Sequence, residues 1–68
     1  MVKLGQVYIG KLTNIERTVV AIDGQNEDDI IILKVYYPEH RVLYLSCTVK
    51  QLKECCTLKE ETKWQSTN

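Results

Sequence analysis

The feature that most constrains this chain is an apolar run at residues 30–37, IIILKVYY, in which Lys34 is the only residue other than Ile, Leu, Val or Tyr. The run is far shorter than the roughly 20 apolar residues that span a bilayer. Its β-branched and aromatic residues favour a strand over a helix. We therefore expect a strand here, and the question is what covers its two sides.

Side chains alternate between the two faces of a strand, so the run has two apolar faces. One face is Ile31, Leu33, Val35 and Tyr37, and the other is Ile30, Ile32 and Tyr36, interrupted by Lys34. We expect the face that contains Leu33 to be core. The second face needs a cover from the helix or from Trp64, or else it is an exposed patch that binds a partner.

The length of 68 residues allows one small domain. We assign residues 1–60 to this domain and residues 61–68 to a flexible polar C-terminal tail. A domain of this size buries only about 60% of the surface of its unfolded chain. A homodimer would supplement so small a core.

Charge and cysteine content limit the possible partners and location. Nine basic residues balance nine acidic ones, which disfavours nucleic acid, although a nucleic-acid-binding barrel that uses Tyr36 and Tyr44 remains the alternative. Three cysteines, Cys47, Cys55 and Cys56, cannot all pair within the chain. Because no secretory signal or membrane-spanning segment is evident, we expect a cytoplasmic protein with reduced, buried thiols and no membrane association.

The remaining pattern is mostly β-like. Alternating apolar residues and turn residues predict five strands, at residues 6–12, 15–23, 30–37, 41–47 and 57–60. In the second strand, Ile15, Val19 and Ala21 are expected on one side. Gly10 interrupts the first strand and suggests a bulge or a close crossing there.

A short helix is predicted between the fourth and fifth strands. Thr48 and Gln51 have the spacing of a capping box. Val49, Leu52 and Cys56 follow at helical spacing and are expected to face the core.

This order of elements carries a family resemblance. The segments GQVY at residues 5–8, DG at 23–24 and SCTxxxL at 46–52 are similar to those of small SH3-like proteins of uncharacterised function from bacteria and phages. The resemblance covers about residues 4–60. It implies a mainly β fold, a small five-stranded SH3-like barrel with one short helical turn between strands 4 and 5.

The same resemblance implies a phage or mobile-element accessory protein, such as a host-directed inhibitor that binds a larger protein. The ALYDY segment and paired-Trp groove of peptide-binding SH3 domains are absent, so recognition of proline-rich ligands is not implied. An OB-like barrel is the competing fold, but it places its helix after the third strand.

Catalytic and metal-binding patterns are weak. His40, in a predicted turn, is the only histidine, which disfavours acid–base chemistry. Zinc binding by His40 and the cysteines lacks the usual paired Cys-x₂-Cys spacing. The acidic residues 27–29 lack the ligand spacing of a calcium loop and are expected to form a solvated turn. We therefore expect no enzyme activity and no cofactor.

The four tyrosines, without any phenylalanine, suit positions that are dry at one end and wet at the other. Core or rim packing, a protein interface, and base stacking or an aromatic cage all remain open. We predict a non-enzymatic protein–protein interaction module. Its candidate partner-binding residues are Ile30, Ile32, Tyr36 and Tyr44.

Overall fold

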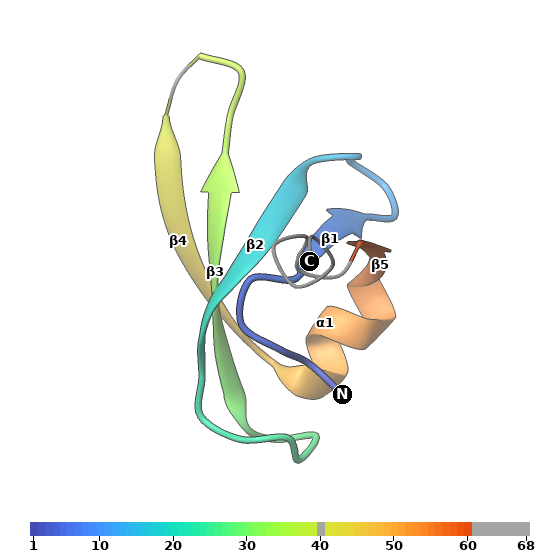
Figure 1. Ribbon diagram of the computed structural model, residues 1–68. Coiled ribbons are helices and arrows are strands. Elements are labelled where there is room, and N and C mark those ends of the chain that lie inside the picture. The colour runs from blue at the N-terminus through green and yellow to red at the C-terminus, as the bar shows by residue number, and fades with distance from the viewer. Residues whose placement is uncertain (40, 61–68) are drawn as a thin grey trace, which may run out of the picture.

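The computed structural model describes residues 1–39 and 41–60. The elements are β1 (Val7–Gly10), β2 (Glu16–Ile22), β3 (Ile30–Tyr36), β4 (Val42–Thr48), α1 (Val49–Cys55) and β5 (Cys56–Glu60). The fold is mainly β, with a short helix between the fourth and fifth strands (Figure 1). The fold prediction is thus confirmed, whereas His40 and the predicted tail with Trp64 lie outside the described residues.

The five strands form one antiparallel sheet with the order β4-β3-β2-β1-β5. The first four strands are consecutive neighbours, and α1 then returns the chain so that β5 pairs with β1. The sheet is strongly bent, and the β3–β4 hairpin rises past the other elements at the top of the view (Figure 1). β4 and β5 are therefore the two edge strands.

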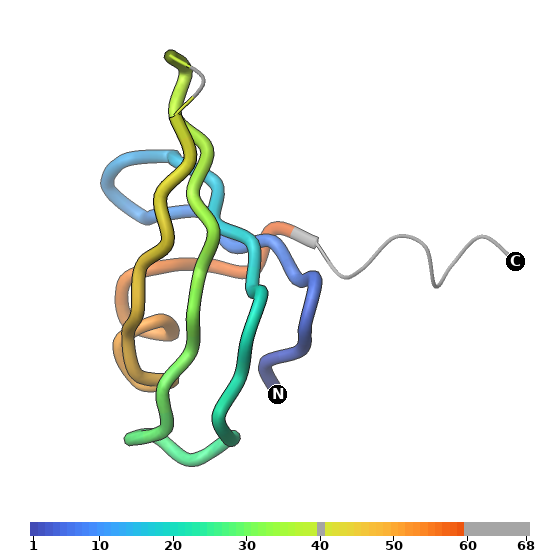
Figure 2. The backbone as a smooth tube through the Cα atoms, turned by 90° about the vertical axis from the view of Figure 1, so that its left-hand side faces the viewer, coloured from blue at the N-terminus to red at the C-terminus, as the bar shows by residue number. Residues whose placement is uncertain are grey.

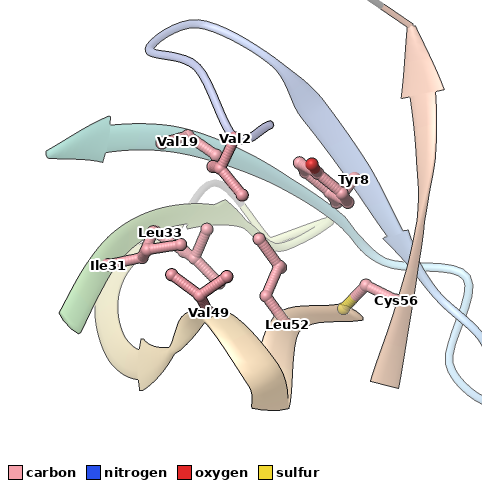
Figure 3. Packing of buried hydrophobic residues seen from close by; sticks show 8 residues of the cluster. All are labelled: Val2, Tyr8, Val19, Ile31, Leu33, Val49, Leu52 and Cys56. Atoms are coloured by element: carbon pink, nitrogen blue, oxygen red, sulfur yellow. The ribbon is translucent and has the colours of Figure 1, made fainter. Parts of the chain in front are cut away.

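The hydrophobic core lies between the bent sheet and α1 (Figure 3). We call the side of β2, β3 and β4 that faces this core the inner face, and the opposite side the outer face. Leu33 and Ile31 of β3 point inward and are almost fully buried, as the sequence predicts. The core cluster is Val2, Tyr8, Val19, Ile31, Leu33, Val49, Leu52 and Cys56.

The predicted alternation in β2 is wrong after Val19. Val19 pairs with Leu33, but Ala21 pairs with Ile32, so the ladder shifts by one residue at a β-bulge around Val20. The extra residue reverses the phase of the alternation. Ala21 is therefore exposed, and Ile22 packs against the core instead.

The helix begins at the predicted capping box. The Gln51 backbone N–H donates to Thr48 Oγ1 at 3.1 Å, and the Thr48 N–H donates to the Gln51 side chain at 2.9 Å. Val49 and Leu52 are buried as expected. Cys56 is also buried, but it is the first residue of β5 rather than part of the helix.

The turn between β1 and β2 depends on two residues. Asn14 has a φ of 59°, which asparagine tolerates better than most residues. The side chains of Arg17 and Thr13 lie close to Gly10, and the register of the β1 ladders does not shift there, so the predicted bulge is not found at this glycine. The irregularity in the β1–β5 ladder lies between Val7 and Tyr8 instead.

Two glutamines fix the N-terminal segment. The Gln25 side chain accepts from the Val2 N–H at 3.0 Å and donates to the Val2 carbonyl at 2.8 Å. Gln6 is 2% exposed, and its Oε1 accepts from the Lys3 N–H at 2.8 Å and the Tyr8 hydroxyl at 3.2 Å. These bonds offset the cost of burying polar groups and hold Val2 in the core.

Candidate functional site

All four predicted partner-binding residues lie on the outer face of the sheet. Ile30, Ile32 and Tyr36 alternate with the buried residues of β3. Tyr44 of β4 pairs with Lys34, which places it on the same side. The outer face of the hairpin is made by Ile30, Ile32, Lys34 and Tyr36 of β3 with Val42, Tyr44, Ser46 and Thr48 of β4.

Much of this face is exposed and apolar. Tyr44 is 62% exposed and Tyr36 is 56% exposed, while Ile30 and Val42 are each exposed by about two-fifths. Ile32 is half-buried. Helix α1 packs behind the sheet, on the inner side, so the helix does not provide the cover considered for this face (Figure 2).

Lys34 is the charged residue in the middle of the face. Its Nζ lies 5.0 Å from the centre of the Tyr36 ring, a cation–π distance. Hydrogen bonding to the Tyr36 side chain, followed by charge interactions with Tyr36 and Tyr44, raises the pKa of Lys34. The face therefore combines apolar groups, two phenolic hydroxyls and a cation that is protonated at neutral pH.

The inner face of β4 is also partly exposed. Leu43 pairs with Val35 and Leu45 with Leu33, so both leucines are on the core side, yet each is 40% exposed. The hairpin extends past the part of the core that α1 covers (Figure 1). Between β4 and α1 lies a shallow apolar groove, lined by Arg17, Leu33, Leu45, Ser46, Cys47, Gln51, Leu52, Cys55 and Cys56.

Backbone bonds at both ends of the hairpin fix which groups of β4 point away from the sheet. The Tyr37 N–H donates to the backbone carbonyl of Arg41 at 2.9 Å, and the Val49 N–H donates to the backbone carbonyl of Asp29 at 3.0 Å. Antiparallel pairing alternates, so residues 43, 45 and 47 bond to β3. The N–H and C=O groups of Val42, Tyr44 and Ser46 therefore point outward, along an edge that no other described strand pairs with.

The three cysteines are free thiols. Cys56 is buried and Cys47 half-buried, but Cys55 is exposed, so the expectation that all three are buried is wrong for Cys55. Cys55 is the last residue of α1, and its side chain is exposed although the next residue, Cys56, belongs to the core cluster. Burial, then the neighbouring Cys56 and Cys55, raises the pKa of the Cys47 thiol despite the opposing effect of Arg17.

The protonated Cys47 thiol is a poor nucleophile, because the thiolate is the reactive form. Within residues 1–39 and 41–60, no three His, Cys, Asp or Glu side chains are grouped so as to hold a metal ion. In the acidic loop, Asp29 accepts from the Asn26 N–H at 3.0 Å. This carboxylate stabilises the turn.

Within the described residues, no helix combines the length and the apolar character needed to span a membrane. Comparison of the chain with protein-family models, curated proteins and solved structures finds no match. The outer face, the groove and the edge of β4 are therefore the candidate functional surfaces of the described residues.

Proposed function

We propose that this chain is a non-enzymatic protein-binding module, and that the outer face of the β3–β4 hairpin is its binding surface. The observation that carries the proposal is the exposure of Tyr36, Tyr44, Ile30 and Val42 on one continuous face. Contiguous apolar patches on small proteins mark interaction sites. Tyrosine is also enriched in protein interfaces, where its ring packs and its hydroxyl forms hydrogen bonds.

The chemistry of the face favours a partner with an apolar patch and a negative or carbonyl group. Ile30, Ile32 and Val42 supply apolar contact area. Lys34, held against Tyr36, supplies one directed positive charge. Of the residues on this face, the two tyrosines belong to a type that is enriched in binding hot spots.

The order of the strands and the position of α1 support the resemblance to SH3-like barrels. That fold hosts many functions, so it favours no particular partner by itself. A host-directed accessory role is one form that protein binding by this chain would take.

Nucleic-acid binding is the second candidate function. The observation in its favour is that Lys34 lies beside Tyr36 and opposite Tyr44, because exposed aromatic rings near a cation suit base stacking. The net charge of zero argues against it. Titration of single-stranded oligonucleotides at increasing salt tests it, since affinity that falls steeply with salt would support nucleic-acid binding over protein binding.

The test of protein binding is a paired substitution on the outer face, Ile32→Lys with Tyr36→Ser. We expect the double variant to fold, because both side chains point away from the core. A central interface residue contributes about 2 kcal/mol or more, so each substitution weakens binding at least about tenfold. Binding is measured by quantitative capture of partners from host lysate on immobilised protein.

The matched control is Leu12→Lys. Leu12 is 97% exposed in the β1–β2 turn, away from the outer face, so this variant also replaces an exposed apolar residue with lysine. Proteins captured by the parent and the control, but not by the double variant, support the proposal. Equal capture by all three folded proteins would overturn it.

A further inference from the structure

We infer that two copies of this chain associate through antiparallel pairing of their β4 strands, with Tyr44 opposite Tyr44 of the second copy. This inference rests on the proposed function, because it names one partner of the β3–β4 hairpin. It uses the edge of β4, whereas other partners would use the outer face. The two surfaces can therefore be separated by experiment.

The backbone of β4 is suited to a symmetric pair. Its outward N–H and C=O groups belong to Val42, Tyr44 and Ser46, with Tyr44 at the centre. A two-fold axis at Tyr44 places Val42 opposite Ser46 of the second copy. All three residues then form hydrogen-bonded pairs, giving about six backbone hydrogen bonds. Any shift along the strand leaves some of these groups without a partner.

The side chains agree with the same register. On the inner face, Leu43 lies opposite Leu45 of the second copy, so the two partly exposed leucines of each chain cover one another. On the outer face, the two Tyr44 rings lie side by side at the axis. The two outer faces then join into one continuous surface.

Charge does not oppose this pairing. The sequence of β4, VLYLSCT, contains no charged residue. The closest cation on the outer face is Lys34, one strand away, opposite Tyr44. In the dimer the two Lys34 residues are separated by three strand spacings, about 14 Å, which exceeds the screening length of about 8 Å at physiological salt.

The contact is small, because it consists of one strand and its side chains from each copy. Contacts below the standard interface size belong to weak or transient associations. We therefore expect a dissociation constant on the order of 10–100 μM. The dimer would be populated at high local concentration, for example when two copies are bound to one partner.

The test compares two substitutions of the central residue. Tyr44→Pro removes the outward N–H and the ring, and proline is tolerated at an edge position whose N–H faces solvent. Tyr44→Thr removes the ring but keeps the N–H. Sedimentation velocity from about 5 to 500 μM spans the expected range, and circular dichroism checks that each variant is folded.

We expect the parent to dimerise, Tyr44→Thr to dimerise more weakly, and Tyr44→Pro to be monomeric throughout. A monomeric parent at the highest concentration would overturn the inference, as would equal dimerisation of folded Tyr44→Pro and Tyr44→Thr. If Tyr44→Pro does not fold, Val42→Pro, at another outward N–H, replaces it in the comparison with Val42→Thr.

The outer-face double variant keeps every backbone group of β4. We expect it to dimerise like the parent while it loses other partners. If the double variant no longer dimerises but still captures other proteins, then the edge of β4 does not form the dimer contact independently of the outer face. The dimerisation assay and the capture assay therefore test the two proposals separately, and either proposal can fail while the other holds.

Discussion

The two edge strands of the sheet, β4 and β5, differ in ways that predict different behaviour. β4 is seven residues long and uncharged, and its apolar side chains are exposed on both faces. β5 has five residues, and its Lys59 forms an ion pair with Glu16 of β2, across β1. Short strands and lysine side chains are common protections of sheet edges.

This difference indicates that β5 is protected from pairing with another strand, whereas β4 is open to it. The open edge is also the strand that carries Tyr44 and borders the outer face. A long, apolar edge without charge is an aggregation risk unless it has a partner. An edge of this kind in so small a domain favours a binding role for the hairpin.

The largest expected effect tests the orientation of the hairpin. Leu33→Lys places an unpaired charge opposite Leu45 in the core, at a cost of several kcal/mol against a total stability of roughly 5 kcal/mol. We expect this variant to be unfolded by circular dichroism and to show no cooperative thermal transition. Ile32→Lys, at the adjacent outward position, is the control and is expected to melt cooperatively.

A melt of Leu33→Lys within a few degrees of the parent would mean that the faces of β3 are reversed. The inner and outer assignments of β4 would then be reversed as well, since the two strands share one register. The assignment of exposed side chains to the two faces of β4, on which the comparison of the two edge strands depends, would then be wrong.

A prediction of intermediate size compares the rates at which the cysteines near the two edge strands react. Cys47 is half-buried in β4, Cys56 is buried in β5, and Cys55 is exposed between α1 and β5. We expect iodoacetamide to label Cys55 first, then Cys47, and Cys56 at least about tenfold more slowly than Cys55, because a buried thiol reacts only after local opening. Peptide mass spectrometry over time measures the three rates.

The raised pKa of Cys47 sets the direction of the pH dependence. Folded Cys47 holds its proton more tightly than the unfolded chain does, so its stabilising contribution is complete below the ordinary thiol pKa. It is lost as the pH rises through the folded pKa. Labelling of Cys47 should accelerate at a higher pH than in the urea-unfolded chain, and equal pH profiles would contradict the shift.

The smallest expected effect concerns the protection of β5. Lys59→Gln removes the ion pair with Glu16. Exposed pairs contribute about 0.2–1 kcal/mol, so we expect the melting temperature to fall by a few degrees at most. Lys11→Gln, an exposed lysine in the β1–β2 turn, controls for loss of charge. A much larger drop for Lys59→Gln alone would show that this edge depends on the pair.

Local sequence patterns predicted much of the fold. The two faces of β3 followed from strict alternation, and the start of α1 from the spacing of Thr48 and Gln51. The placement of Ile30, Ile32, Tyr36 and Tyr44 on one face followed from the same alternation. Each of these features depends on residues close together in the chain.

Features that depend on distant contacts were missed. The bulge at Val20 has no marker such as glycine, so alternation alone predicts Ala21 on the same side of the strand as Val19. Val2 and Gln6 were not recognised as buried, because their burial requires Gln25 and Tyr8. Nor does local alternation show which strand is at an edge, so the exposure of Leu43 and Leu45 could not be predicted.

The two hydrogen bonds between the Gln25 side chain and the Val2 backbone make the Val2 amide proton a reporter on the N-terminal segment. Gln25 bonds both backbone groups of Val2, as a neighbouring strand would, while the Val2 side chain is buried. Release of the N-terminal residues must break this pair of bonds, whether or not the rest of the sheet opens. Hydrogen–deuterium exchange at the Val2 N–H therefore reports the detachment of this segment, and its rate relative to the central strands separates local detachment from global unfolding.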